Sequence, residues 1–169
     1  MLDYRSMNHL EICALAALLA TPLAACSHTD DMMSGDYVSM QATLADAQAE
    51  NQHHAEACEA ASSMPEMMDE LTRHEKSMNG IMAHMDEARG HMGDGSTGMG
   101  MRHCTGPDFD HMSRAVDDIH SMMSGHSTVM WSVEELDAAR SECSTHTGEM
   151  DDVMEGMMSD LESMSCVER

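Results

Sequence analysis

Several kinds of residue are scarce in this chain of 169 residues, and each scarcity limits what the protein can be. Lysine and arginine number only 8 against 31 aspartates and glutamates, for a formal net charge of −23, so the clustered cations that hold nucleic acid phosphates are missing. Aromatic residues make up 2% of the chain, which leaves little to enclose a porphyrin. Past Cys26, leucine, isoleucine, valine and phenylalanine total only 13, against 21 methionines, a composition that indicates disorder unless periodicity argues otherwise.

Sequence motifs of known enzyme classes are also lacking. There is no G-x-S-x-G, no H-E-x-x-H, no CxxCH and no zinc-type pair of CxxC motifs. The stretch "GDGSTG" at 93–98 matches a dinucleotide-binding loop, but no strand precedes it. Glu50-x2-His53 is half of a carboxylate-bridged di-iron motif, and only Asp117-x2-His120 approximates the other half. We therefore expect no enzyme.

The N-terminal region predicts export. Residues 10–25, "LEICALAALLATPLAA", are too short to span a bilayer but suit the apolar part of a signal peptide. They end in "LAAC", which resembles the lipobox of bacterial lipoproteins. No other segment is long and apolar enough to span a membrane.

The resemblance to lipoproteins implies a signal peptide over 1–25, a lipid on Cys26 and a flexible tether over 26–35. It further implies anchoring in the cell envelope, on the periplasmic face or the outer membrane, and Ser27 is similar to the residue found in proteins sent to the outer membrane. The alternative is an ordinary signal peptide that happens to precede a cysteine. Met7 is an alternative start to Met1.

The rest of the chain reads as two copies of one unit. With an offset of 72 residues, 36–86 matches 108–158 without a gap at nine positions. These include the run "H-x3-M-x2-[IV]-M-x2-M", which begins at His74 in the first copy and at His146 in the second. The repetition predicts an internal duplication.

Each copy predicts two helices, over 36–61, 64–92, 107–130 and 133–165. Two Ser-x-x-Glu capping boxes mark the second helix of each copy, Ser63 with Glu66 and Ser132 with Glu135. The glycine-rich segment 93–106 reads as a flexible linker between a hairpin at 36–92 and a second at 107–169, and no strand is expected. The predicted fold is all-α, an antiparallel four-helix bundle built from two tandem helical hairpins.

Four cysteines remain beyond Cys26, an even number that suits disulfides in an oxidising compartment. An up-down bundle favours Cys58–Cys143 with Cys104–Cys166, provided the two hairpins are staggered. If "SGH" at 124–126 is a turn instead, Cys104–Cys143 with Cys58–Cys166 is the better pairing. Free thiols that bind metal are a further alternative.

Methionine and histidine share one helical stripe in each copy. At 100° per residue the stripe spans about 80°. Its members are the strongest candidate metal ligands: His74, Met78, Met82, Met85, His146, Met150, Met154 and Met157. Glu70 and Glu142 each precede one of these histidines by four residues and are expected to orient the imidazoles. The weaker candidate ligands are His54, His126, Met99, Met101 and His103.

Thioether and imidazole together suit Cu(I) or Ag(I). In composition, though not in alignable sequence, the chain resembles the Met/His-rich copper- and silver-handling proteins of the bacterial envelope. The sequence therefore predicts a lipid-anchored protein that binds Cu(I) or Ag(I) for sequestration or metal resistance, with no nucleic acid partner. The alternatives are a structural or chaperone-like envelope protein, in which methionine merely packs the core or accepts varied partners, and an oxidant sink.

Overall fold

The computed structural model describes residues 35–94, 102–164 and 166–168. The predicted signal peptide, Cys26 and most of the predicted tether lie outside these residues. The described part forms four helices and two short strands: α1 Gly35–Ala60, α2 Met64–Asp94, β1 Arg102–Cys104, α3 Pro107–Met130, α4 Leu136–Ser163 and β2 Cys166–Glu168. All four predicted helices are present, and their ends lie within three residues of the prediction.

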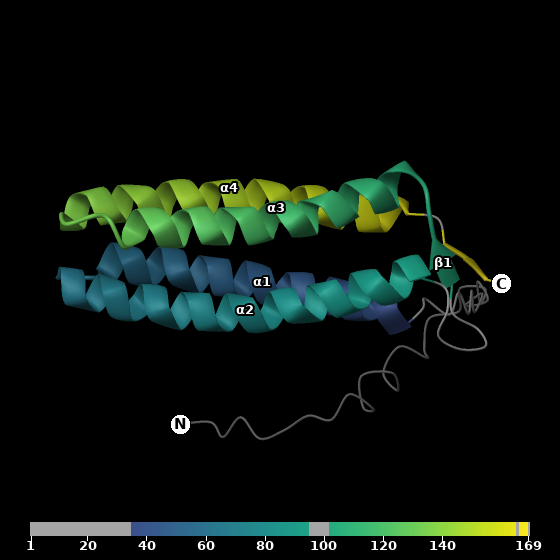
Figure 1. Ribbon diagram of the computed structural model, residues 1–169, viewed down its shortest axis with the longest axis horizontal. Helices are drawn as coiled ribbons and strands as arrows, with labels where there is room; N and C mark the ends of the chain where they lie inside the picture. The colour runs from purple at the N-terminus through teal and green to yellow at the C-terminus, as the bar shows by residue number, and fades with distance from the viewer. Residues whose placement is uncertain (1–34, 95–101, 165, 169) are drawn as a thin grey trace, which may run out of the picture. The chain divides into compact units, whose positions relative to one another are not determined.

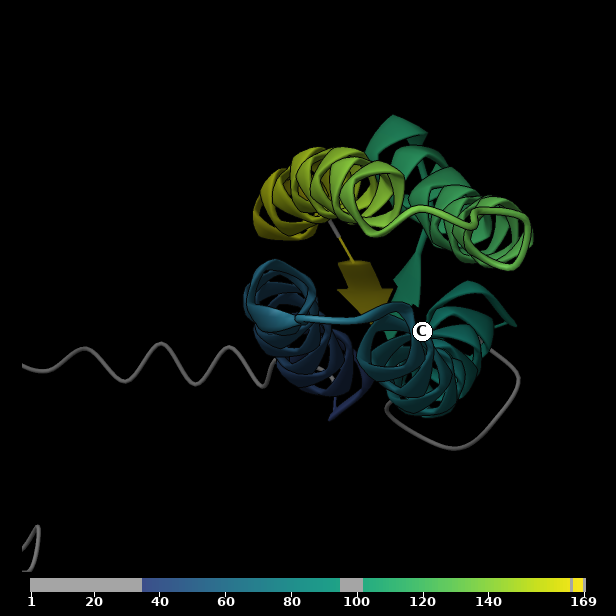
Figure 2. The same ribbon diagram turned by 90° about the vertical axis from the view of Figure 1, so that its left-hand side faces the viewer.

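The helices form an antiparallel four-helix bundle, as the sequence predicts. Helices α1 and α2 make one hairpin and α3 and α4 the other, and the two hairpins lie against each other along their length (Figure 1). Viewed from the end with the tight turns, the four helices occupy the corners of a square, in which α1 adjoins α2 and α4 (Figure 2). Helix α3 in turn contacts α2 and α4. Each helix therefore has two adjacent neighbours and one face toward a shared core, where α2 and α4 also meet across the diagonal.

Alternating spacings of three and four residues explain why these segments form a bundle. The spacing keeps one narrow stripe of each helix toward its neighbours. Along α3 the buried residues are Met112, Val116, Ile119, Met123, His126 and Met130. The core has two parts: a large, methionine-rich cluster toward the strands and a smaller cluster toward the tight turns.

The two tight turns are built differently. At the start of α2, the Ser63 hydroxyl accepts a hydrogen bond from the Glu66 N–H at 3.4 Å, and the Glu66 carboxylate accepts one from the Ser62 N–H at 2.7 Å. The predicted second capping box is wrong. Helix α4 begins at Leu136 with no side-chain cap, and the Ser132 hydroxyl donates instead to the Val129 carbonyl oxygen at 2.7 Å, closing the turn after α3.

A short antiparallel ladder closes the opposite end of the bundle, and the expectation of no strands was wrong there. Strand β1 pairs with β2 in a register that sets Cys104 opposite Cys166. The ladder and the end of α2 occupy part of the segment predicted as a flexible linker. Gly106 follows with a φ of 109°, a conformation that glycine adopts without strain, directly before Pro107 begins α3.

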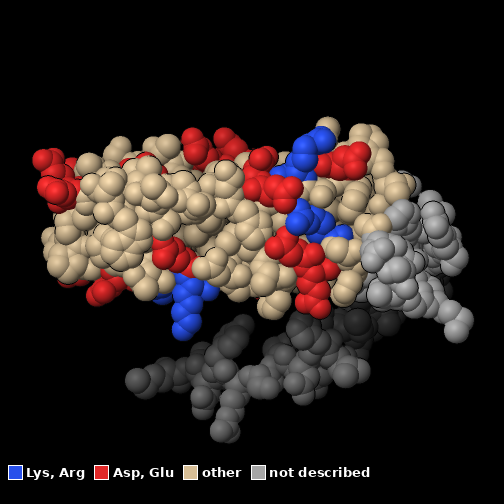
Figure 3. Space-filling view, viewed as in Figure 1, with Lys and Arg blue, Asp and Glu red and all other residues tan. Residues whose placement is uncertain are grey.

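The surface is acidic, with the few basic side chains set among carboxylates (Figure 3). Arg89 on α2 bonds Asp86 on its own helix at 2.7 Å and Asp117 on α3 at 2.6 Å. His120 on α3 also contacts Asp86, at 3.0 Å, so this group links the two hairpins. Within the described residues, no helix is both long and apolar enough to cross a membrane.

Candidate metal centre

Four histidines, one from each helix, meet inside the bundle. They are His54 on α1, His74 on α2, His126 on α3 and His146 on α4, and their exposed fractions are 0%, 0%, 3% and 3%. Each takes a core position in the three-four spacing of its helix, where an apolar residue is usual. The histidine layer, as we call these four residues, lies between the two parts of the core.

The rings of the histidine layer form two stacked pairs at right angles to each other. His54 stacks on His74 with ring centroids 3.8 Å apart, and His126 stacks on His146 at 4.0 Å. Rings of different pairs meet edge to face, with centroids 5.4 to 6.4 Å apart. The Nε2 atoms of His54 and His126 face each other at 3.3 Å.

Glutamates occupy the outer nitrogens of three of these rings. Glu70 contacts Nδ1 of His54 at 2.9 Å, and Glu142 contacts Nδ1 of His126 at 3.3 Å. Both contacts repeat with the offset of 72 residues found in the sequence. Nδ1 of His74 bonds Glu50 at 2.9 Å.

These contacts correct one prediction. Glu70 and Glu142 do orient imidazoles, but across the hairpin, on the preceding helix, rather than on the histidine four residues later. Glu50, which orients His74, was not predicted for this role. Nothing in the spacing of one helix signals a contact that forms only when α1 and α2 pair.

Arg73 fixes two of the three carboxylates. Its guanidinium donates to both oxygens of Glu50, at 2.9 and 2.8 Å, and to both oxygens of Glu70, at 2.8 and 2.7 Å. Burial raises the pKa of Glu50, but the hydrogen bonds from Arg73 and His74 outweigh it and bring that pKa down to about 2. The pKa of Glu70 is lowered for the same reasons, with Arg73 and His54 as its donors. Both carboxylates are therefore ionised at neutral pH.

An ionised carboxylate only accepts hydrogen bonds, so Nδ1 carries the proton in His54 and His74. Burial lowers the pKa of all four histidines, to about 4 for His74 and about 2 for His146, and keeps the rings neutral. A neutral ring with its proton on Nδ1 has a lone pair on Nε2. Lone pairs thus lie inside the histidine layer, and among the residues that the structure describes, Nε2 of His74 and Nε2 of His146 have no hydrogen-bond partner although they are buried.

The Nε2 pair of His54 and His126 has the spacing of metal ligands. Donors that hold an ion tetrahedrally at about 2.0–2.1 Å stand about 3.3–3.4 Å apart, and the observed separation is 3.3 Å. Two lone pairs at this distance repel each other unless a cation or a shared proton lies between them. Because the rings are stacked in pairs, binding one ion with all four requires His74 and His146 to turn toward it.

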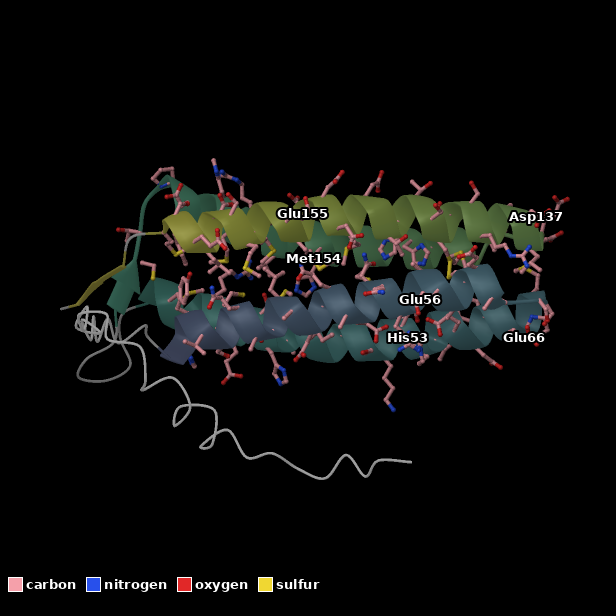
Figure 4. The ribbon with its side chains drawn as sticks, turned by 180° about the vertical axis from the view of Figure 1, so that it is seen from behind. His53, Glu56, Glu66, Asp137, Met154 and Glu155 are labelled. Carbon is pink, nitrogen blue, oxygen red and sulfur yellow. A yellow bond between two sulfur atoms is a disulfide. The ribbon has the colours of Figure 1, made fainter. Side chains whose placement is uncertain are left out.

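The predicted methionine ligands lie in the core. Met78, Met82, Met85, Met150, Met154 and Met157 are all buried, with exposed fractions between 0% and 4%. In Figure 4, Met154 lies between the two hairpins, whereas the labelled His53, Glu56 and Glu155 lie on the outer surface. By spacing, Met78 and Met150 are the stripe members next to the histidine layer. Met99 and Met101 lie outside the described residues, as does the side chain of His103.

A disulfide adjoins the histidine layer on the side of the tight turns. Cys58 on α1 is bonded to Cys143 on α4, with Cα atoms 6.4 Å apart, which confirms the predicted pair. Its Cys58 sulfur lies 3.6 Å from Nε2 of His54. Cys104 is also disulfide-bonded, and the strand register is consistent with the predicted partner Cys166.

The comparison with known proteins identifies no relative of this chain. The chain matches no family model, no curated protein and no solved structure.

Proposed function

We propose that this protein binds Cu(I) or Ag(I) in the histidine layer and serves to sequester or transfer that ion in the cell envelope. The observation that carries the proposal is the pair of Nε2 atoms of His54 and His126, which face each other at 3.3 Å while carboxylates hold both Nδ1 atoms. Carboxylate partners on the outer nitrogen are the usual support of histidine ligands. Four buried neutral imidazoles have no comparable use in packing, because apolar residues of the same size cost less to bury.

Charge and surrounding atoms favour a monovalent soft ion. The ligands are neutral, and the adjoining part of the core is rich in thioethers, which prefer Cu(I) and Ag(I) over hard ions. The three glutamates lie outside the rings, where they offset the positive charge of a bound ion. The acidic surface attracts cations of any kind and adds nothing to selectivity.

A second function, structural or chaperone-like, is supported by the methionine cluster. Most of its members are buried against one another, as packing residues are, and methionine fills irregular core space. In that case the protein acts in the envelope as a stable acidic helical bundle, and metal ions do not bind to it. Either function would be carried out at a membrane of the cell envelope. The resemblance of "LAAC" to a lipobox supports a lipid on Cys26 that anchors the protein there.

An anaerobic titration of Cu(I) into the disulfide-intact protein, against a chromophoric Cu(I) chelator, tests the proposal. The protein is expected to withdraw about one equivalent from the chelator, because one histidine layer is present. If the chelator keeps all of the Cu(I) at micromolar concentration, the histidine layer is packing and the structural function takes first place.

A further inference from the structure

The Cys58–Cys143 disulfide stands within ligand distance of the proposed site. Cys58 follows His54 by one helical turn, and its sulfur lies 3.6 Å from Nε2 and 3.8 Å from Nδ1 of that ring. Ligand atoms of His54, Cys58 and Cys143 all lie within 4.8 Å of one another. Oxidised to a disulfide, the two sulfurs are poor ligands, whereas the two thiolates of the reduced pair are strong soft ligands.

A third sulfur adjoins this group. Sδ of Met67, at the start of α2, lies 3.8 Å from Sγ of Cys143 and is fully buried. After reduction, one imidazole nitrogen, two thiolates and one thioether would surround the space now bridged by the disulfide. This donor set is softer than the nitrogen set of the histidine layer.

A hollow lies beside the disulfide, whose two cysteines are themselves only 2% and 1% exposed. This hollow of about 370 Å³ opens between α1 and α4, and both cysteines form part of its wall. Arg140 and Thr147 also line it. Glu59 lines the hollow as well, and the Arg140 guanidinium donates to Asp137 at 2.9 Å and to the carbonyl oxygen of Ala61 at 2.6 Å.

We infer that the Cys58–Cys143 disulfide is a redox switch on the metal site, which changes the ligands of the bound ion from imidazole nitrogen to His54 plus two thiolates. The inference rests on the proposed function, since His54 is the residue that the two ligand sets share. It names the regulation of that site: the oxidised protein holds a soft ion by nitrogen, and the reduced protein holds it more tightly by sulfur.

The electrons and protons balance with an external dithiol as the reductant. The dithiol supplies two electrons and two protons, its own sulfurs form a disulfide, and the Cys58–Cys143 bond breaks into two thiols. Each thiol then releases its proton to solvent when it binds the ion. Oxidation by a disulfide donor reverses the sequence and returns the ion to the nitrogen ligands.

Co(II) and Cu(I) binding by the full protein, in its disulfide-intact form and after reduction with a dithiol that is then removed anaerobically, tests this inference. Co(II) reports its ligands directly, because bound thiolate gives an intense charge-transfer absorption in the near ultraviolet and imidazole does not. We expect this absorption only in the reduced protein, together with a Cu(I) affinity at least about tenfold higher than in the oxidised protein. Circular dichroism on the same samples checks that the helices persist.

Cys58→Ala with Cys143→Ala is the matched control. The reductant also opens the disulfide of Cys104, and the double variant experiences that change equally while lacking the two thiolates. A reduced wild-type protein without the thiolate absorption, or a double variant with the same absorption, overturns the inference.

A single variant removes the need for reductant. Cys143→Ala leaves the thiol of Cys58 beside His54 with the Cys104 disulfide intact, and it should show a weaker thiolate absorption without reduction. Absence of that absorption in a folded, Co(II)-binding variant counts against the inference. If the disulfide-intact wild type takes up neither ion, the proposed function fails. If it takes up both but reduction leaves the spectrum unchanged, only the switch fails.

Discussion

His54 and His126 occupy the same position in the two hairpins, 72 residues apart, and their Nε2 atoms face each other at 3.3 Å inside the bundle. The pairing of their outer nitrogens, with Glu70 and Glu142, obeys the same offset. Two equivalent sets of contacts thus meet where the hairpins pack together, as an internal duplication of one hairpin predicts.

Replacing His54 and His126 together by leucine should abolish tight Cu(I) binding, with a loss of affinity of about a hundredfold or more. Leucine suits these fully buried positions, so the helix content should stay unchanged. Chelator competition measures the affinity, and circular dichroism measures the helix content. His53→Leu is the control, because His53 lies next to His54 in sequence but is exposed. An equal loss of affinity in the control would assign the binding to surface histidines.

Acid should destabilise the metal-free bundle through the buried histidines. Burial lowers the pKa of His74 to about 4 and of His146 to about 2, from 6.5 when unfolded. The contribution of these two rings to the free energy of unfolding is fully present above pH 6.5. It is lost as the pH falls, because the rings bind protons in the unfolded state but stay neutral in the folded state. For each ring the loss is about 1.4 kcal/mol per pH unit, and for His74 it ends near pH 4.

Urea unfolding at pH 7 and pH 5, with wild type and His146→Leu, measures this loss. The variant lacks one buried ring and should lose less stability between the two pH values than the wild type. Because both proteins have the same carboxylates, the effect of carboxylate titration on stability cancels in the comparison. Equal losses of stability in the two proteins would contradict this prediction, because they would mean that the pKa of His146 is the same in the folded and unfolded states.

Arg73 should act on metal affinity although it touches no ligand nitrogen. Arg73→Met releases Glu50 and Glu70, which orient His74 and His54, and such changes around histidine ligands cost about 10- to 100-fold in affinity. The measurement is again chelator competition with Cu(I). Arg89→Met is the control: it removes the ion pairs with Asp86 and Asp117, which lie away from the histidine layer, and should leave the affinity unchanged.

Substitutions of Met78 and Met150 distinguish a role of methionine as a metal ligand from a role in core packing. Met78→Leu with Met150→Leu keeps the buried volume nearly constant, so the free energy of unfolding should change by less than about 1.5 kcal/mol per substitution. If these thioethers complete the ligand set, Cu(I) affinity falls by about tenfold. Met92→Leu with Met112→Leu, in the same cluster but toward the strands, is the control for packing. Unchanged affinity in both pairs would leave the methionines as core residues.

Much of the fold was predictable from the sequence because it depends on local spacing. Four amphipathic segments, two tight turns and an offset of 72 residues leave an antiparallel bundle as the simplest arrangement, and they also favoured the Cys58–Cys143 pair. The ladder of β1 and β2 was missed because three-residue strands have no periodicity of their own. The start of α4 was misplaced because Ser132 and Glu135 resemble a capping box but close a turn instead.

The site was predicted less completely. Helical spacing placed His74 on one stripe with methionines of the same helix. In the structure the His74 ring stacks on His54 of α1. From the sequence, His54 and His126 ranked below the methionines because they lie outside the repeated run that begins at His74 and His146. Their importance arises from the antiparallel register, which sets residue 54 level with residue 74 and residue 126 level with residue 146. Register between helices is a tertiary property that a single stripe does not encode.

The central claim is that the metal ligands are the Nε2 atoms of the histidine layer, and nitrogen NMR of the imidazoles during a titration with Ag(I) tests it most directly. Before addition, His54, His74 and His126 should each show a protonated Nδ1 and an unprotonated Nε2. About one equivalent of Ag(I) should then shift the Nε2 signals of the buried histidines and leave the exposed His53 unchanged. Shifts confined to methionine methyl groups or to exposed histidines would contradict the account.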